Sequence, residues 1–455
     1  MAVKRLIIIP FIFGFVFCAK AQSELTLPFL NDVFQSSYIN PTVIPEHTIS
    51  IGLPGMSSVY GQAVTNGFLL KNITYFKDDT TYINANKLLA DLKDKNLIYA
   101  GSSVDLFHIR LKVRNGYYWI GARNNFNTSF QYPKDFLALA VKGNEPYLGK
   151  TLDLSNLNID AMLYNEYSIG MALEYNHWII GGRISLLQGL SNIQLDNKGL
   201  YIHIDSSMYS QTYNANVRLN TSGIPKDGNG DISFDHVQEA DYITNYLSNF
   251  KNKGFSLSAG ATYKLNDQLK FSFSFYDLGF INWKDSVTNY NLKGNSSFSG
   301  LDILHSYLNN ENIETDTIID SILDDFNRDT IQKSYRTYLH PKFNISATYN
   351  VFSRTMVGFS AFGVYNKKLY PAFTLGVSQG LGRFFNILAT VSYNQRTIRN
   401  LGVGMVINSG PTQFYIVADN YYPAINPKYF TNTNVRVGIN LVFGRVKPAV
   451  GLPYR

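Results

Sequence analysis

The sequence predicts an all-β protein: a transmembrane antiparallel β-barrel of about fourteen strands (12–16), with an N-terminal plug-like segment and long extracellular loops. Three observations predict this fold class: segments of nine to eleven residues in which apolar and polar side chains alternate, an unusual composition, and an export segment at the N-terminus. Charged residues make up 16% of the chain and aromatic residues 15%. A barrel with an apolar lipid face and aromatic residues at both edges has this kind of composition.

The N-terminus reads as a secretory signal peptide. Two basic residues precede an uncharged apolar run over 6–18 and then Ala-Lys-Ala, which predicts a signal peptide over 1–21 that is cleaved before Gln22. The alternative is a spanning helix, but the run of thirteen residues is shorter than the roughly 20 that a bilayer requires. Cleavage would remove Cys18, the only cysteine, so we expect no disulfide in the mature chain.

The alternation is clearest over residues 165–175. One face of this segment is apolar and has Tyr167 and Tyr175 at its ends, while Glu166 and Glu174 lie on the other face. Tyrosine at both ends is typical of the aromatic girdle at the two membrane interfaces. The predicted girdle residues are Tyr167, Tyr175, Trp178 and Tyr263.

Strands of this kind recur along the chain. An even total near fourteen follows, with twelve or sixteen as alternatives. A soluble β-sandwich also alternates, but the export segment, the aromatic ends and strands longer than the soluble mode of about five or six residues favour the barrel. The expected strands lie near 103–114, 117–127, 165–175, 177–187, 255–265, 269–280, 343–351, 356–365, 372–380, 384–394, 401–408, 413–420 and 434–443, with 212–219 as a weaker candidate.

The remaining segments are expected to be a plug and loops. Residues 22–455 should form a single barrel domain in which 22–54 is the candidate plug segment. Residues 86–97 have the pattern of a short amphipathic helix. Long insertions, among them 235–252 and the acidic segment 300–327, belong on the extracellular side of a barrel or in its mouth.

Several short motifs carry a family resemblance. They are Leu27-Pro28-Phe29, Tyr38-Ile39-Asn40-Pro41, Ile51-Gly52-Leu53-Pro54, Tyr132-Pro133-Lys134-Asp135, the run 142–154 and Tyr167-Ser168-Ile169-Gly170. With them the mature chain resembles an outer-membrane family of Bacteroidota known only as a domain of unknown function, DUF5723. That family is similar in plan to fatty-acid-transporter-type barrels, whose N-terminal segment plugs the lumen, and the broad grouping includes barrels that serve protein secretion. The resemblance implies location and fold, and it brings no catalytic residue.

Charged side chains share the polar faces of the predicted strands. If the apolar faces meet lipid, these charged side chains point into the lumen. One interpretation is a salt-bridge ladder that fills a closed barrel, and the other is an anion-favouring conduit or a site for a carboxylate head group. The candidate lumen-facing residues are His108, Arg110, Lys112, Arg123, Glu166, Glu174 and Arg183.

The sequence shows no recognisable catalytic or metal site. None of the seven histidines stands in a nucleophile motif or at metal-ligand spacing, so we expect no enzyme, cofactor or metal. Residues 226–235 resemble the middle of an EF-hand loop, but Pro225 and His236 occupy the positions of its first and last ligands. Export would lower the net charge from +7 to +4, too small an excess to indicate nucleic acid.

Two functions remain open at this point. The leading hypothesis is non-enzymatic transport of a small hydrophobic or amphipathic solute across the outer membrane. The alternative is a scaffold or adaptor for secretion, surface assembly or motility, in which loops 195–252 and 300–327 contact an envelope protein partner. Outer-membrane lipids are expected partners in both cases.

Overall fold

The computed structural model describes residues 24–77, 80–206, 210–225, 246–298, 326–366, 368–382, 384–394 and 397–445. The predicted signal peptide, the EF-hand-like segment 226–235 and almost all of the acidic segment 300–327 lie outside the described residues.

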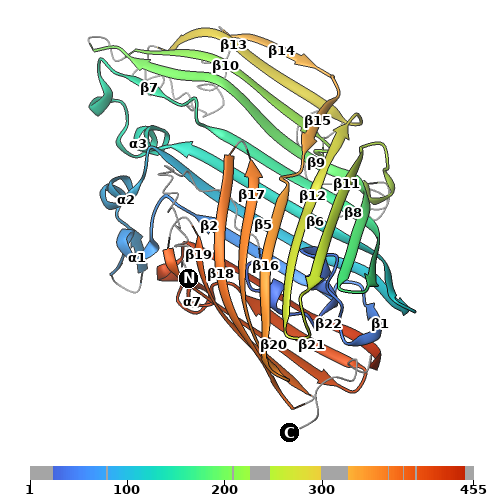
Figure 1. Cartoon of the computed structure of the whole chain (residues 1–455). Coiled ribbons are helices and arrows are strands. Elements are labelled where there is room, and N and C mark those ends of the chain that lie inside the picture. The colour runs from blue at the N-terminus through green and yellow to red at the C-terminus, as the bar shows by residue number, and fades with distance from the viewer. Residues whose placement is uncertain are drawn as a thin grey trace, which may run out of the picture.

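Fourteen antiparallel strands close into a barrel (Figure 1). The first is interrupted: β1 (His47–Gly52) and β2 (Val59–Thr65) both pair with β22 on one side and β5 on the other, which closes the wall. The other thirteen strands are β5 (Lys95–Val113), β6 (Gly116–Pro133), β8 (Asn158–Tyr175), β9 (Trp178–Ile204), β11 (Lys253–Lys264), β12 (Leu269–Trp283), β16 (Lys342–Phe352), β17 (Thr355–Asn366), β18 (Lys368–Leu381), β19 (Phe385–Asn394), β20 (Thr397–Ser409), β21 (Thr412–Ala418) and β22 (Asn432–Arg445).

The predicted strand number is correct, but one strand was assigned wrongly. Residues 212–219 do form a strand, β10 (Gln211–Ser222), yet it pairs with the outer part of β9 and with β13 and takes no part in the wall. The missing wall strand is β1 with β2, and β1 falls inside the predicted plug segment 22–54. A break of six residues, 53–58, hides the alternation there, because Ser57 and Ser58 are buried while Met56 is exposed.

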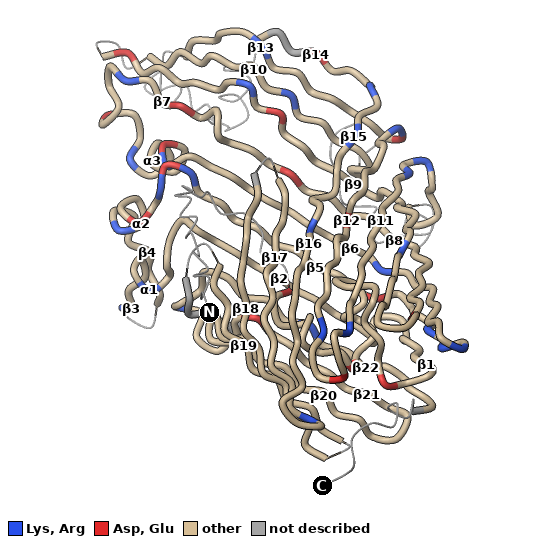
Figure 2. Tube along the Cα trace, viewed as in Figure 1, with Lys and Arg blue, Asp and Glu red and all other residues tan. Residues whose placement is uncertain are grey.

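The two ends of the barrel differ. At the short-turn end, links of a few residues join β5 to β6, β8 to β9, β11 to β12 and β16 to β17, whereas most links at the opposite, long-loop end carry insertions. Between the ends the outer face is apolar: Ile169, Ile180 and Leu375 are each more than 60% exposed. Charges are sparse over β17–β20 and gather at the turns, loops and outer sheet (Figure 2). Such an apolar belt is the surface that a transmembrane barrel presents to lipid.

An outer sheet stands on the long-loop end (Figure 1). Strand β9 continues past the wall and pairs with β7 (Thr151–Asp153) and β10, and β10 pairs in turn with β13 (Val287–Phe298) and β13 with β14 (Asn327–Ile331). A short strand β15 (Tyr335–Tyr338) then leads back to the wall beside β12. Helix α3 (Lys134–Lys142) packs against the inner side of this sheet through Phe136 and Leu139, which contact Leu152, Ile202 and Ile204.

The helices in the described part of the chain are short. They are α1 (Leu70–Ile73), α2 (Ala85–Asp91), α3 and α7 (Tyr422–Ile425), and β3 (Thr74–Lys77) with β4 (Thr80–Ile83) forms a separate hairpin. None of these helices is long or apolar enough to cross a membrane. The helix expected over 86–97 stops at Asp91, because β5 begins at Lys95 and pairs there with Pro133 of β6.

The segment before β1 fills the barrel. Residues 24–46, which we call the plug, contain two 3-10 turns, Leu27–Phe29 and Phe34–Tyr38. Its apolar side chains are buried against strands from every side of the wall; Leu27, Phe29 and Leu30, for example, form one cluster with Leu388, Val406 and Tyr415.

Candidate functional site: the lumen cavity above the plug

A cavity of about 170 Å³ lies inside the barrel, between the plug and the long-loop end. Plug residues Glu24, Tyr38 and Ile39 contribute to its lining, and strands from most of the circumference supply the rest. Its tyrosine rings are Tyr38, Tyr60, Tyr99, Tyr164, Tyr276 and Tyr338. Its aliphatic side chains include Leu97, Met162, Leu339 and Val364, and its charged side chains are Glu24, Arg123, Asp160, Asp277, Lys342 and Arg436.

Asp277 reaches this cavity through a β-bulge. Between Leu257 and Ala259 the register of β11 against β12 shifts, and Asp277 adopts a left-handed conformation with φ of 59°. Simple alternation from the inward-facing Tyr276 would turn Asp277 toward lipid, where a carboxylate is costly. The bulge re-aims it inward, and aspartate tolerates positive φ better than most residues.

Three cations surround two carboxylates beside the cavity. Nη2 of Arg123 lies 2.7 Å from Glu166 and 3.8 Å from Asp277. Arg183 lies 3.6 Å from Glu166 and 3.8 Å from Asp277, and Lys342 lies 2.7 Å from Asp277. All five side chains are largely withdrawn from solvent, so mutual pairing is what makes their burial tolerable.

The same cations hold the plug. Arg183 donates to the carbonyl oxygens of Ser37 and Tyr38, at 3.5 and 3.4 Å. The Tyr38 ring lies under Arg123, 4.5 Å from its guanidinium carbon, and 5.7 Å from those of Arg183 and Arg436. Since a guanidinium is attracted to an aromatic face, Tyr38 joins the plug to three separate wall strands.

Further contacts fix the start of the plug. Arg436 donates to both carboxylate oxygens of Glu24, at 2.5 and 3.0 Å. The backbone amides of Leu25 and Thr26 donate to Asp419, at 2.8 and 2.7 Å. Hydrogen bonds to charged groups, such as these, are among the stronger types. The plug is therefore held both at its start, by Arg436 and Asp419, and near Tyr38, by Arg183.

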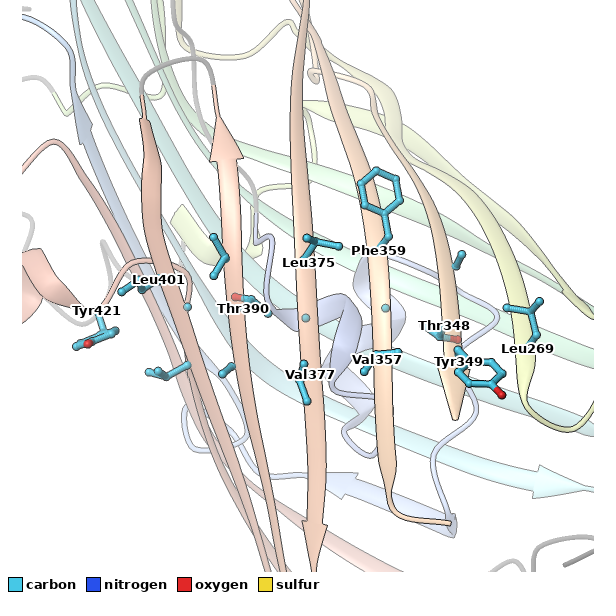
Figure 3. Close-up of a pocket in the computed structure, with 17 residues that line it drawn as sticks. Leu269, Thr348, Tyr349, Val357, Phe359, Leu375, Val377, Thr390, Leu401 and Tyr421 are labelled. Carbon is cyan, nitrogen blue, oxygen red and sulfur yellow. The ribbon is translucent and has the colours of Figure 1, made fainter. Parts of the chain in front are cut away.

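Glycines in the wall make room for the plug. Phe29 lies against Gly358 and Gly376, where an added methyl group would come within 2.7 and 3.0 Å of its ring. On the outer side of these strands is an apolar groove of about 730 Å³, shown in Figure 3. Leu269, Tyr349, Val357, Phe359, Leu375, Val377, Leu401 and Tyr421 line it from the lipid side.

The predicted lumen-facing residues fall into three groups. Arg123, Glu166 and Arg183 form the charge cluster just described, while His108 and Arg110 are buried beneath it beside the plug. Glu174 does not meet Arg183; it pairs with Lys264 near the short-turn end. Lys112 is half-buried, and its Nζ lies 5.3 Å from the Tyr117 ring.

The predicted girdle residues lie at two levels. Tyr175, 76% exposed, stands beside the turn to Trp178, whose ring centroid is 4.8 Å from that of Tyr263. Tyr167 lies toward the long-loop end, where its hydroxyl donates to Gln188 at 3.0 Å.

Several residues of the site were not found from the sequence. Asp277, Lys342, Arg436 and Glu24 belong to it, although none was a candidate. One signal was present for Asp277, because a carboxylate at a lipid-facing position of an alternating strand implies a bulge. Glu24 lies outside any periodic segment, so no pattern marks it. Within the described residues, no group of three or more histidine, cysteine or acidic side chains gathers to hold a metal ion.

Comparison with known proteins gives one family match. Residues 41–419 match the model of a family described as a family of unknown function, DUF5723. No curated protein sequence matches the chain.

Solved structures with a similar fold are barrels. The Pseudomonas putida toluene transporter TodX has a TM-score of 0.44 at 9% identity, with 90% of this chain and 95% of that chain covered. The Ralstonia pickettii toluene transporter TbuX has a TM-score of 0.44 at 7% identity, with 91% and 95% covered. A Pseudomonas aeruginosa FadL homologue has a TM-score of 0.43 at 8% identity, with 90% and 93% covered.

Proposed function

The chain belongs to DUF5723, a family of unknown function, and we propose that it is a non-enzymatic outer-membrane channel for a small hydrophobic or amphipathic solute. The observation that carries this proposal is the lumen cavity above the plug. Toluene transport is named for two of the barrels above, but the argument for this chain rests on its cavity alone.

The lining of the cavity suits a solute with an apolar body and a polar head. Tyr99, Tyr164 and Leu97 offer rings and aliphatic surface to the body, and pockets for small molecules typically combine such surface with a few polar groups. Arg123 and Lys342 face the same space with a guanidinium and an ammonium group, respectively. A solute that entered from the long-loop end, which we assign to the cell exterior, would meet Tyr38 and Ile39 of the plug as its floor.

Filling the cavity tests the proposal. Ser103 is buried on β5 and lines the cavity, so Ser103→Phe should obstruct it. The matched control is Ser409→Phe, at the exposed last residue of β20 beside the turn to β21. We expect the first variant to lower uptake of radiolabelled amphipathic solutes into proteoliposomes about tenfold and the control to leave it unchanged.

A panel of hexanoate, phenylacetate, benzene and glucose would define the solute class. Heat-modifiable gel migration would show that each variant is folded. Equal uptake by the Ser103→Phe variant, the Ser409→Phe variant and the parent protein for every member of the panel would overturn the proposal.

One observation favours a second function, that of an adaptor for a partner protein. The outer sheet exposes polar side chains on β10 and β13, among them Asn214 and Asn295, which bond to each other at 2.6 Å, and Arg218, which donates to Asn291. A surface so far beyond the wall has no part in a channel. The adaptor function can be tested by affinity purification of the parent protein from detergent-solubilised outer membranes. A stoichiometric partner protein that is lost when Asn214, Arg218 and Asn295 are replaced by glutamate would support this function.

A further inference from the structure

Arg110 is a buried cation without an anionic partner. It stands on β5 near the short-turn end, with only 1% of its surface exposed. Its Nη2 donates to the carbonyl oxygen of Val43 in the plug, at 2.7 Å, but Nε and Nη1 have no hydrogen-bond partner in the part of the chain that the structure describes. Among the described residues, no carboxylate forms an ion pair with it. Buried arginines are usually paired, because an uncompensated charge in a dry environment is costly.

The neighbouring strand adds another unused donor. Trp119 lies directly opposite Arg110 in the pairing of β5 with β6, and its buried indole nitrogen also has no hydrogen-bond partner among the described residues. The guanidinium carbon lies 5.7 Å from the Trp119 ring and 4.8 Å from the Tyr117 ring. Three donor nitrogens on two adjacent side chains therefore remain unsatisfied in one buried place, and buried donors without a partner are rare in native proteins.

A second cation is near the same ring. Lys112 is the next inward-facing residue of β5 toward the short-turn end, and its Nζ lies 5.3 Å from the Tyr117 ring that Arg110 also contacts. Lys112 is only half-buried, so it connects Arg110 to solvent at that end. Cation–π contacts attract both groups, but they supply neither a formal negative charge nor a hydrogen-bond acceptor for the three donor nitrogens.

We propose that Arg110, Trp119 and Lys112 form a binding site for one small monovalent anion of the chloride class, which enters from the short-turn end. The anion accepts hydrogen bonds from Arg110 and the indole of Trp119 and neutralises the guanidinium. Arg110 does not line the lumen cavity, so this site is distinct from the proposed solute site. The site adjoins the plug, because Arg110 also holds Val43.

The tryptophans offer a direct measurement. The chain has three, Trp119, Trp178 and Trp283, so replacing the last two by phenylalanine leaves Trp119 as the only indole. In this background, iodide is titrated at constant ionic strength, maintained with fluoride, and the fluorescence is recorded. We expect saturable quenching that chloride reverses, because a bound halide lies against the indole.

Variants separate the site from collisional quenching. Arg110→Met should weaken iodide binding about tenfold or more, since it removes a charge-assisted hydrogen bond, and Lys112→Met should weaken it less. Arg354→Met, at an exposed turn of the same end, is the matched control and should behave like the parent. If Arg110→Met fails to fold by heat-modifiable migration, Arg110→Lys replaces it and should retain saturation at lower affinity.

Two results would contradict the anion site. Quenching that rises linearly with iodide and that chloride does not reverse would mean that water satisfies the donor nitrogens of Arg110 and Trp119. Saturable quenching of equal strength in the parent and the Arg110→Met variant would place the halide elsewhere. Either outcome overturns the proposal.

Discussion

The ammonium nitrogen of Lys342 lies 2.7 Å from a carboxylate oxygen of Asp277, a residue sixty-five positions earlier. Asp277 can accept this bond only because the bulge in β12 turns it inward with a positive φ. A local backbone irregularity thus supplies one of the two carboxylates that compensate Arg123, Arg183 and Lys342.

Asp277→Asn should destabilise the barrel by about 3 kcal/mol, the cost typical of removing one partner from a buried ion pair. Arg123 and Arg183 would then retain Glu166, whereas Lys342 would lose the carboxylate with which it pairs. The free energy of unfolding in urea, followed by heat-modifiable migration, checks this. Asp267→Asn, in the exposed turn before β12, is the control and should remain within ~0.5 kcal/mol of the parent; an equal effect of both changes would contradict the role of the bulge.

Tyr38→Ala should loosen the plug. The ring is in contact with three guanidinium groups, and losing ~1.4 kcal/mol of attraction would raise the open fraction of barrels about tenfold. Tyr38→Phe retains the ring and should behave like the parent. Single-channel recording in planar bilayers measures the open fraction; if Tyr38→Phe opens the channel as often as Tyr38→Ala, the hydroxyl rather than the ring is responsible.

Gly358→Ala should displace Phe29, because the added methyl group would lie 2.7 Å from its ring. Overpacking of this kind typically costs about 1–3 kcal/mol. At Gly61 of β2 a methyl group would meet no atom within 4 Å, so Gly61→Ala should be neutral. Urea unfolding of both variants, and of the double variant Gly358→Ala/Phe29→Ala, tests the contact: the double variant should lose less stability than the two single changes added together.

Acid should release the segment 246–252 at the long-loop end. Asn249 and Lys251 donate to Asp285 at 2.7 and 2.9 Å, and these bonds hold the pKa of its carboxyl below the usual range. A lowered folded-state pKa gives stability that is present above the unfolded value of about 4 and is lost as the pH falls through the folded value. Hydrogen exchange at pH 6 and pH 3 should show the opening, and Asp285→Asn should show little difference between the two.

The alternation was sufficient to predict the barrel but not the plugged site. Strands such as 165–175 were predicted because each lipid-facing side chain is apolar, a constraint repeated at every second residue. Asp277 and Asp105 both lie at register shifts, which reverse the alternation and are not visible in the local pattern. The plug sequence has no alternation of apolar and polar residues. Its position depends on long-range contacts such as the hydrogen bond from Arg183 to the carbonyl oxygen of Tyr38, 145 positions earlier in the chain.

The interruption of the first wall strand has a similar cause. The backbone carbonyl oxygen of Ser57 accepts two hydrogen bonds, one from the side chain of Gln35 in the plug and one from the hydroxyl of Tyr415 in β21. Residues 53–58 are therefore shaped by the plug and by β21 rather than by their own alternation. A segment whose conformation depends on distant partners gives no periodic signal, and for that reason β1 was assigned to the plug.

Strand β9 is 27 residues long and passes without a break from the short-turn end into the outer sheet. At ~3.3 Å per residue it extends about 90 Å, several times the ~25 Å of a barrel's apolar band. No flexible linker separates the two parts of this strand, and ladder hydrogen bonds continue on both. The outer sheet is therefore rigidly joined to the barrel, so the tilt of the barrel in the membrane determines the height and the orientation at which the outer sheet meets any partner.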